Sequence, residues 1–400
     1  MSRAAGMTLF FSFALSIVGS IHYYLWARLV RDPAWPLPWR YVGAAVIVML
    51  ALSIPSLFIF ARGLGVELPR GVLWAVFSWM GVMFFLLVLL AVSDVTRLIA
   101  GGVLKIAHAG TGLTSPERRS ALARLVGGGV MLLALGTSVV ATRSALAGPA
   151  LRFVRVPLRR ISQALAGLRI VQLSDLHLGP TIDGEFLADI VRRTNELQPD
   201  IIAITGDLVD DSVPALRDAV ASLAQLRARY GVYFVTGNHE YYVGVEGWLV
   251  ELRRLGIRVL RNERVRVGEG AASFDVAGVD DWSAHQFGNG HGADLAKALA
   301  GRDANVPVVL LAHQPRAIHE AAARGVDLQL SGHTHGGQIW PFGYLVKLTQ
   351  PYLDGLHQHG ESAIYVSRGT GYWGPPMRLG GRSEISVLEL AAGDATPAQA

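Results

Sequence analysis

The first 150 residues of the chain carry long apolar windows in which no polar face recurs. The stretch from Val82 to Val92, for example, has no side that it could present to water. A helix of this kind is typical of a bilayer interior and not of the surface of a soluble protein. Four windows are long enough to cross a hydrocarbon core of roughly 30 Å. We therefore predict transmembrane helices at residues 7–27, 41–61, 72–92 and 125–146.

From residue 168 onward the pattern changes to short apolar runs rich in β-branched residues, which predict strands. These runs lie at 169–174, 201–205, 232–236, 308–312 and 326–330. Amphipathic patterns between several of them predict helices at 186–197, 215–229 and 317–324. Because strands and helices alternate, we expect an α/β fold with a largely parallel sheet.

The two patterns divide the chain into four parts. We predict a transmembrane region at 1–149, a membrane-proximal linker at 150–167, an α/β domain at 168–391 and a disordered tail at 392–400. The linker alternates apolar and basic residues up to Arg160, which also fits an edge strand near the membrane. Its four arginines, Arg152, Arg155, Arg159 and Arg160, are expected to attract anionic lipid headgroups.

Composition supports the membrane region, because 51% of the residues are apolar and only 17% are charged, a low charged fraction for a soluble protein. The formal net charge is +5. Much of the arginine excess lies in loops that flank the predicted spans and in the linker, so nucleic acid is not needed as a partner to explain it. The expected partner is the lipid bilayer.

Side chains that bind metals follow five of the predicted strands. They occur in the segments Asp175 to His177, Gly206 to Asp207, Gly237 to Glu240, at His313, and in Gly332 to His335. In α/β sheets, ligands bind beyond the carboxyl ends of the strands. One such motif alone is equally well explained as a turn, but five in this order favour a shared site.

The chemistry of these side chains points to a particular class of ion. Imidazole nitrogens mixed with carboxylate and amide oxygens suit Mn, Fe or Zn better than Ca or Mg, and the absence of cysteine excludes a thiolate site. A two-metal site for phosphoryl transfer holds its ions about 3.5–4 Å apart. An anionic bridge is needed because two dications repel each other. Asp207, between the flanking motifs, is the expected bridge.

The ordered motifs resemble the metallophosphoesterase, or calcineurin-like phosphoesterase, superfamily over residues 168–391. The resemblance implies a β-sandwich of mixed, largely parallel sheets flanked by helices, and a metal-dependent phosphoester hydrolase with two divalent ions. The metal ligands that it implies are Asp175, His177 and His335 for one ion, Asn238, His313 and His333 for the other, and Asp207 for both.

The resemblance also implies the catalytic roles. His239 follows the metal-binding asparagine and would face the scissile phosphate instead of binding a metal. A histidine in that place can exchange a proton near neutral pH. A hydroxide bridging the two ions would attack the phosphorus in line.

Longer stretches at 173–179, 327–338 and 367–371 are similar to membrane-associated bacterial phosphoesterases, which include lipid-nucleotide pyrophosphatases and cell-envelope phosphodiesterases. The similarity implies a phosphodiester or pyrophosphate substrate that is lipid-linked. Arg368 is a candidate for binding the substrate phosphate, since guanidinium binds phosphate bidentately, or else a structural residue. The loop at 280–292, rich in glycine and histidine, is expected at the rim of the site.

Two other functions stay open from sequence alone. The first is a nuclease with the same metal site, although no interleaved aromatic and basic residues indicate a strand-binding groove. The second is a membrane sensor or scaffold that keeps its metals for structure. The presence of His239 argues against the second function, because a scaffold needs no group that faces a phosphate.

The orientation of the spans in the membrane is predicted from one pair of arginines. The Lys and Arg counts on the two sides of the membrane are nearly balanced, at 8 and 7. Arg118 and Arg119 resemble a twin-arginine export signal, or else act as a cytoplasmic anchor. Both interpretations keep this pair inside, so we predict a multi-pass cell-membrane protein whose α/β domain is extracytoplasmic.

Overall fold

The computed structural model describes residues 3–60, 66, 68–106, 115–288 and 290–393. The chain forms two compact units, one from Met1–Thr142 with Gly374–Pro376 and the other from Arg143–Trp373 with Met377–Ala400. Residues 394–400 of the predicted tail lie outside the described residues. Each unit has its own architecture.

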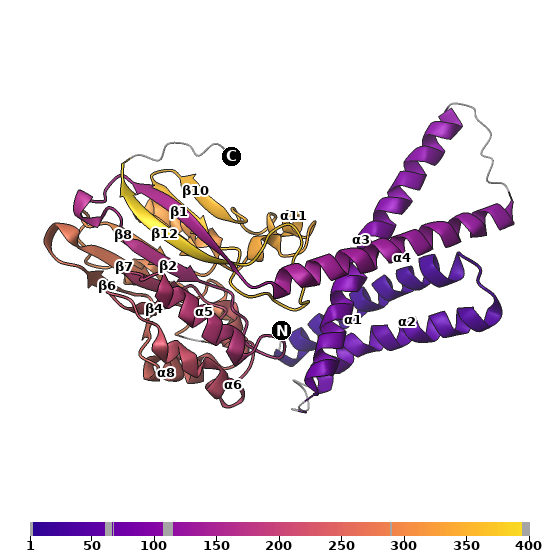
Figure 1. Cartoon of the computed structure of the whole chain (residues 1–400), viewed down its shortest axis with the longest axis horizontal. Coiled ribbons are helices and arrows are strands. Elements are labelled where there is room, and N and C mark those ends of the chain that lie inside the picture. The colour runs from indigo at the N-terminus through magenta and orange to yellow at the C-terminus, as the bar shows by residue number, and fades with distance from the viewer. Residues whose placement is uncertain (1–2, 61–65, 67, 107–114, 289, 394–400) are drawn as a thin grey trace. The chain divides into compact units, whose positions relative to one another are not determined.

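The first unit is built from long apolar helices (Figure 1). They are α1 (Arg3–Trp26), α2 (Leu37–Phe58), α3 (Arg70–Ile106) and α4 (Pro116–Leu146). Segments long and apolar enough to cross a membrane occur at Ser12–Arg31, Leu37–Leu57, Arg70–Val103 and Pro116–Leu146. Each window predicted from the sequence overlaps one of these four segments.

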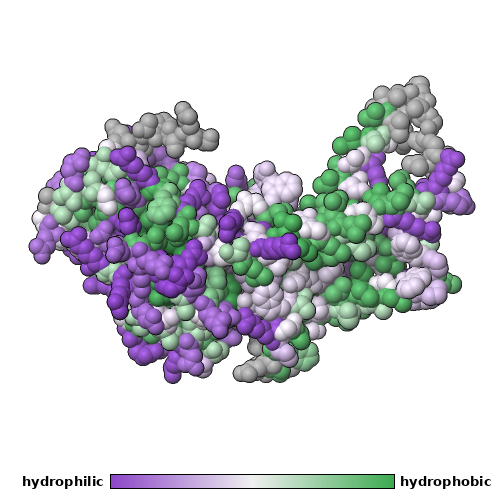
Figure 2. Space-filling view, viewed as in Figure 1, coloured by the Kyte–Doolittle hydropathy of each residue, from purple (hydrophilic) through white to green (hydrophobic). Residues whose placement is uncertain are grey.

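The surface of these helices is apolar. Large side chains such as Leu98, Leu125 and Leu132 are exposed on them, and Figure 2 shows the long helices mainly in green, whereas purple dominates the surface of the other unit. Apolar surface of this extent is stable in contact with lipid and unfavourable in water. The four helices therefore have the length and the surface of membrane spans.

The second unit contains two six-stranded sheets. The first sheet has the order β1 (Ala150–Leu158), β12 (Glu384–Ala392), β2 (Arg169–Leu173), β3 (Ile201–Ile204), β4 (Val232–Phe234) and β5 (Arg258–Val259). The second has the order β10 (Gly355–His359), β11 (Ser362–Val366), β9 (Leu328–Ser331), β8 (Val308–Leu311), β7 (Phe274–Gly278) and β6 (Glu263–Val267).

Most strand pairs in both sheets are parallel. The exceptions are β12 with β2, β6 with β7, and β10 with β11, which are antiparallel. The carboxyl ends of β2, β3 and β4 therefore point to the same edge of the first sheet, and those of β8 and β9 to the same edge of the second. The expectation of an α/β fold with mixed, largely parallel sheets is confirmed.

The two sheets pack against each other and carry helices on their outer faces. Ile170 and Tyr233 of the first sheet share a buried cluster with Val276 and Leu328 of the second. The helices outside the first sheet are α5 (Gly184–Glu196), α6 (Val213–Val220) and α8 (Val245–Arg254), and those outside the second are α9 (Leu295–Ala298) and α10 (Ile318–Ala323). Strands in both sheets are consequently buried on both faces, which explains their continuous apolar sequences.

The helix α5 shows how the sequence sets these boundaries. Asp183 is its N-cap, and its side chain accepts a hydrogen bond from the Phe186 backbone N–H at 3.1 Å. Leu187, Ile190 and Val191 then recur at helical spacing and are buried against the sheet.

The predicted helix at 215–229 is shorter in the structure. The α-helix α6 ends at Val220, and a 3₁₀-helix covers Ala221–Gln225. The reason is a side chain from α5, because Asn195 donates to the carbonyl of Gln225 at 2.8 Å and accepts from the N–H of Arg227 at 2.9 Å. These two bonds replace the helical bonds that the segment would otherwise make.

The segment predicted as a linker or edge strand contains β1, which pairs in parallel with β12 at the edge of the first sheet. Arg152 and Arg160 form ion pairs with Glu384 and Asp327 in the same unit. Part of the basic charge expected to face lipid is therefore used inside the protein.

Candidate metal centre

The polar side chains singled out in the sequence converge at the strand ends of both sheets. Asp175 and His177 follow β2, Asp207 follows β3, and Asn238 and His239 begin α7 (Asn238–Tyr242) after β4, while His313 follows β8, and His333 and His335 follow β9. The loops of the first sheet therefore supply five of these residues and those of the second sheet three. Such a site exists only when both sheets are folded and packed.

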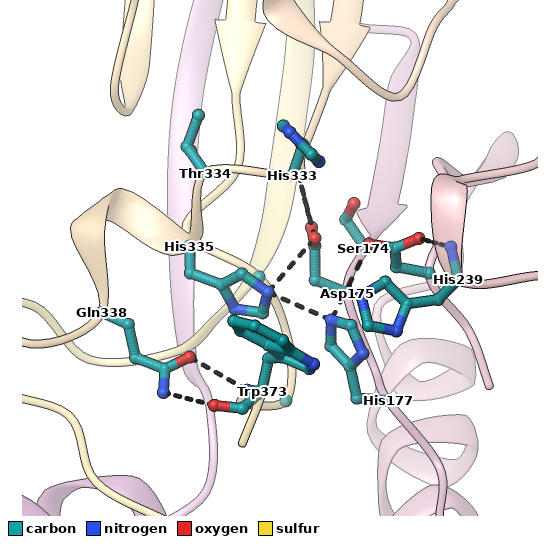
Figure 3. Close-up of polar contacts among 12 residues, drawn as sticks. Ser174, Asp175, His177, His239, His333, Thr334, His335, Gln338 and Trp373 are labelled. Atoms are coloured by element: carbon teal, nitrogen blue, oxygen red, sulfur yellow. Dashed lines mark hydrogen bonds and ion pairs between the residues drawn. The ribbon is translucent and has the colours of Figure 1, made fainter. Parts of the chain in front are cut away.

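One group of donor atoms is formed by Asp175, His177 and His335, which are all buried. Nε2 of His177 lies 3.1 Å from Nε2 of His335, and the latter lies 3.5 Å from Oδ1 of Asp175. Figure 3 shows these side chains pointing toward one another from the loops after β2 and β9. Donors at these separations fit around one ion that binds nitrogen at roughly 2.0–2.1 Å.

A second group is formed by Asp207, His313 and His333. Nε2 of His313 lies 3.0 Å from Oδ2 of Asp207 and 3.2 Å from Nδ1 of His333. The same Oδ2 of Asp207 lies 3.9 Å from Nε2 of His177 in the first group. One carboxylate oxygen of Asp207 is therefore close to both groups, as a bridging ligand would be.

The side chain of Asn238 adds an independent sign of a missing partner. Its amide nitrogen donates to the Tyr242 hydroxyl at 3.3 Å, but its buried Oδ1 has no hydrogen-bond partner. A buried acceptor without a partner costs about 1–3 kcal/mol. A divalent ion would satisfy this oxygen, so the donor set fits metal binding.

Hydrogen bonds to the far side of two imidazoles orient the rings. Nδ1 of His177 lies 2.9 Å from Oδ1 of Asp210, and Nδ1 of His313 lies 2.7 Å from the carbonyl oxygen of Thr205. Each partner accepts a hydrogen bond, so Nδ1 carries the proton. The lone pair of Nε2 is then directed toward the centre of the site, where it can bind a metal. Metal-binding histidines are commonly held in this way.

The protonation of the remaining two imidazoles also suits metal binding. Burial and the neighbouring His313 lower the pKa of His333 to about 3. Burial and the neighbouring His177 hold the pKa of His335 well below its ordinary value. Both rings are therefore neutral near pH 7, which is the form that binds a metal.

The backbone of the site is strained at the candidate ligands themselves. Among the described residues, nine that are not glycine have a positive φ, and five of these are candidate ligands: Asp175, His177, Asp207, His333 and His335. Such conformations cost of order 1–3 kcal/mol each and are concentrated at functional sites. The backbone thus identifies the same site without reference to side-chain chemistry.

Two glycines let the loops approach these ligands. A Cβ on Gly237 would lie 2.1 Å from Oδ1 of Asp207, and a Cβ on Gly332 would lie 2.1 Å from Oδ2 of Asp175. Real side chains do not tolerate such distances. Glycine is therefore required at both positions by the close packing of one motif on another.

Glu240, for which the sequence suggested no role, fixes two of the motifs together. Its buried carboxylate accepts hydrogen bonds from the backbone N–H groups of Asp207, Leu208 and Gly237, at 3.1, 2.7 and 2.7 Å. Burial raises the pKa of Glu240 to about 7, and the neighbouring Asp207 adds to this shift. The Glu240 side chain therefore holds the loops after β3 and β4 together.

Asp210 is the second residue that the sequence analysis missed. Its Oδ1 lies 2.9 Å from Nδ1 of His177 and 2.7 Å from Nδ1 of His239. Burial opposes ionisation, but the two imidazoles outweigh it and hold the pKa of Asp210 far below its ordinary range. Asp210 is three residues beyond Asp207 in the same loop, and this spacing is visible in the sequence.

His239 is placed beside both donor groups without belonging to either cation site. Its ring lies 4.6 Å from the ring of His177, centroid to centroid. Burial opposes its protonation, but Asp207 and the hydrogen bond to Asp210 outweigh this effect and raise the pKa of His239 to about 9. Because Nδ1 faces Asp210, Nε2 is the nitrogen available to another molecule.

The structure places the predicted phosphate-binding Arg368 in an ion pair. Its Nε donates to Oδ2 of Asp354, and its aliphatic carbons pack on Gly336. These contacts favour a structural role for Arg368, and its contact with substrate stays a prediction. A different arginine, Arg378, is buried and donates to the carbonyl oxygens of His335 and Gly371 at 3.1 and 2.7 Å. It joins the loop that carries His335 to the segment after β11, in which the Gly371 N–H donates to the carbonyl oxygen of Asp175 at 3.0 Å.

The loop expected at the rim reaches the site through aromatic side chains. Asp280 and Asp281 at its start are buried. Further along, the ring of Phe287 lies 5.6 Å from that of Tyr242, which in turn lies 5.1 Å from the ring of His239. The loop therefore borders the surroundings of His239, and none of its described residues belongs to the two donor groups.

Comparison with known sequences gives consistent matches. A sequence model of the family described as calcineurin-like phosphoesterase matches residues 168–337. A Bos taurus protein named transmembrane protein with metallophosphoesterase domain is 39% identical over 402 residues, covering 95% of this chain and 88% of that one. A Danio rerio protein of the same name is 36% identical over 395 residues, covering 96% and 88%. A Helicobacter pylori protein named uncharacterized metallophosphoesterase is 39% identical and covers 69% and 73%.

Solved structures resemble the chain only distantly. A dimetal phosphatase from Danio rerio is 12% identical with a TM-score of 0.32, covering 51% of this chain and 88% of that one. A 5′-nucleotidase precursor from Thermus thermophilus is 16% identical with a TM-score of 0.35, covering 56% and 54%.

Proposed function

Since this chain belongs to the calcineurin-like phosphoesterase family, we propose that it is a membrane-anchored, two-metal hydrolase of phosphodiester or pyrophosphate bonds. The observation that supports the proposal most strongly is the position of Asp207, whose Oδ2 lies 3.0 Å from a donor of one cation group and 3.9 Å from a donor of the other. A carboxylate shared in this way is what two neighbouring dications require.

Two divalent ions would be held by the donor groups described above, one by Asp175, His177, His335 and Asp207, the other by Asp207, Asn238, His313 and His333. Mn, Fe and Zn are the ions that this mixture of donors suits best. When bound, they would supply the positive charge that activates water and offsets the negative charge of the phosphate.

His239 would act on the leaving group. Its Nδ1 is held by Asp210 at 2.7 Å, which fixes the ring and keeps a proton on that nitrogen. Its Nε2 is then available to donate a proton to the oxygen that leaves the phosphorus. A proton donor must be protonated before the reaction, and the carboxylate of Asp210 beside Nδ1 stabilises the protonated ring.

A lipid-linked or cell-envelope substrate is the proposed class. A protein held in a membrane meets substrates in the same membrane at a raised effective concentration. The Bos taurus and Danio rerio relatives carry the word transmembrane in their names and match nearly the whole chain. We also propose that the second unit lies on the extracytoplasmic side, on the strength of Arg118 and Arg119.

The two alternatives make different demands on the site. A nuclease would need a basic groove lined by stacking aromatics, and nothing in the sequence pattern favours one. A scaffold would need the metal ligands but not His239 in contact with Asp210. The retained pair of His239 and Asp210 therefore favours an enzyme.

The proposal is tested by turnover of the full chain in detergent. We expect hydrolysis of bis(p-nitrophenyl) phosphate that requires Mn and stops with chelator, and slower hydrolysis of p-nitrophenyl phosphate. His239→Ala should lower kcat by about 100-fold or more while metal content is retained, since it removes the proton donor. His319→Ala, which alters an exposed histidine outside the site, is the matched control.

A full complement of metal with no hydrolysis of either ester would contradict an enzyme and support the scaffold. Equal loss in His239→Ala and His319→Ala would contradict the role given to His239.

A further inference from the structure

An exposed apolar surface follows directly after the last candidate ligand. It is formed by Trp340, Tyr344, Leu345 and Leu348, around the short helix α11 (Gly343–Val346), and we call these four residues the apolar ridge. Leu348 is 79% exposed, Tyr344 65% and Trp340 58%. Side chains of this size are normally covered in a water-soluble unit, and scattered single exceptions need no explanation. Four such side chains exposed within nine residues do need an explanation.

The ridge is anchored to the metal centre by tight backbone packing. A Cβ on Gly337, two residues after His335, would lie 2.6 Å from Cα of Gly343 at the start of α11. The hydroxyl of Thr334 donates to the carbonyl oxygen of Leu353 at 2.6 Å and so fastens the far end of the same loop. The ridge is therefore held in place by the segment that carries His333 and His335.

An aromatic side chain bonded to the segment just before the ridge lies close to His239. The side-chain amide of Gln338 makes two hydrogen bonds with the backbone of Trp373, at 2.8 and 2.9 Å. The half-exposed Trp373 ring lies 5.7 Å from the ring of His239. Gln338, two residues before Trp340, thus links the segment that carries the ridge to an aromatic side chain close to His239.

The composition of the segment matches one kind of partner. Residues 336–353 contain one charged side chain, Lys347, and no acidic residue. Trp and Tyr prefer the headgroup region of a bilayer, leucines bury apolar area below it, and a lysine pairs with anionic headgroups. A protein partner would be expected to meet ion pairs at the rim, which this segment offers almost nowhere.

A bilayer is also within reach of this unit. The last apolar helix, α4, ends at Leu146, and β1 of the second unit begins at Ala150. Three residues therefore separate the first strand of the second unit from the end of a helix that is long and apolar enough to cross a membrane. A connection of this length keeps the second unit near the bilayer that α4 would cross.

We propose that the apolar ridge inserts into the headgroup region of the bilayer beside the catalytic site. Trp340 and Tyr344 lie at the depth of the headgroups, and Leu345 and Leu348 reach the acyl boundary. The surface between the ridge and His239 then lets a substrate with an apolar anchor present its phosphate without leaving the membrane. The substrate step rests on the proposed function, whereas insertion of the ridge does not.

The absence of cysteine allows a site-specific test on the full chain. Leu348→Cys carries a spin label in nanodiscs of phosphatidylethanolamine and phosphatidylglycerol, and collisions are measured with oxygen, which partitions into lipid, and with a water-soluble nickel chelate. Val250→Cys on α8 is the matched control, because Val250 is also an exposed aliphatic residue, at 67%, on another element of the same unit. Figure 1 shows α8 and α11 well apart.

We expect the oxygen-to-nickel collision ratio to be several-fold higher at Leu348 than at Val250. Equal, water-like ratios at both positions would overturn the proposal. A label at Leu348 that is shielded from both reagents would also overturn it, because protein would then cover the ridge.

A second variant tests membrane insertion of the ridge independently of hydrolysis. Leu345→Ser with Leu348→Ser should leave turnover of soluble bis(p-nitrophenyl) phosphate within about twofold of wild type, because neither residue contacts the candidate ligands. In this double variant, a spin label at Tyr344→Cys should give a water-like oxygen-to-nickel collision ratio. If wild type hydrolyses no ester but the labels still report insertion, the proposed function fails and the ridge stands. An unchanged lipid-like ratio in the double variant would contradict the ridge.

Discussion

At the scale of single residues, one carboxylate oxygen connects two functions of the site. Oδ1 of Asp210 contacts Nδ1 of a candidate ligand, His177, and Nδ1 of the proposed proton donor, His239. The charge that orients the ligand therefore also stabilises the protonated donor. Loss of Asp210 should affect metal binding and proton transfer together.

We expect Asp210→Asn to weaken metal affinity by about 10- to 100-fold, the usual effect of removing a partner of a ligand histidine. At saturating metal, kcat should still fall, because the protonated form of His239 loses a stabilising charge. Isothermal titration with Mn and steady-state hydrolysis measure the two effects separately. The adjacent, exposed Asp211→Asn is the control and should change neither. Normal kcat in Asp210→Asn at saturating metal would refute the link to His239.

At the scale of elements, the site depends on loops that pack on one another with no room for a Cβ. Gly332 directly follows β9 of one sheet and lies against Ser174 and Asp175 after β2 of the other. The contact fixes the distance between the two sheets at the point where the ligands meet. A small change in one loop should therefore displace a ligand that belongs to another.

Gly332→Ala should abolish high-affinity metal binding, because the added Cβ would lie 2.0 Å from Oγ of Ser174 and 2.1 Å from Oδ2 of Asp175. Gly247→Ala on α8 is the matched change, since its Cβ would meet only Val213 at an ordinary 3.4 Å. In a helix, alanine is favoured over glycine by about 1 kcal/mol. Metal content by mass spectrometry and circular dichroism check both. Full metal binding in Gly332→Ala would show that the loops after β2 and β9 can move apart to admit the added Cβ, which contradicts the prediction.

The strands that precede the candidate ligands were predictable, because strands buried on both faces leave continuous apolar runs in the sequence. The strands β2, β3, β4, β8 and β9 begin within two residues of the predicted runs. The end of α6 was not predictable, because it depends on Asn195 from another helix. Local periodicity carries no information about such a contact.

The same distinction holds for the site. The candidate ligands could be chosen because metal-binding side chains at strand ends form a local pattern. The roles of Glu240 and Arg378 could not, because they follow from hydrogen bonds to backbone groups of other loops. Glu240 reaches Leu208, far back along the chain, and a single sequence does not show that proximity.

At the scale of the whole molecule, the chain joins a membrane region to a phosphoesterase unit without cysteine anywhere. This composition makes the orientation of the protein directly measurable, since any introduced cysteine is the only reactive thiol. The proposed extracytoplasmic location depends on Arg118 and Arg119 lying inside.

We expect Glu361→Cys, in the second unit, to react with a membrane-impermeant maleimide in intact expressing cells. Ser115→Cys, just before Arg118, should react only after the membrane is permeabilised. Each variant is the control for the other, because both positions directly precede a described element, β11 and α4, and carry polar side chains. The reverse labelling pattern would place the catalytic unit in the cytoplasm.

The most direct test of the account is the number and coupling of bound ions in the full chain loaded with Mn. We expect two Mn ions per chain by mass spectrometry, and an electron paramagnetic resonance spectrum of an exchange-coupled pair. The coupling should disappear in Asp207→Asn, which weakens the bridge, and persist in Asp211→Asn. One ion per chain, or two ions with the spectrum of isolated Mn in wild type, would contradict a shared carboxylate at the centre of the site.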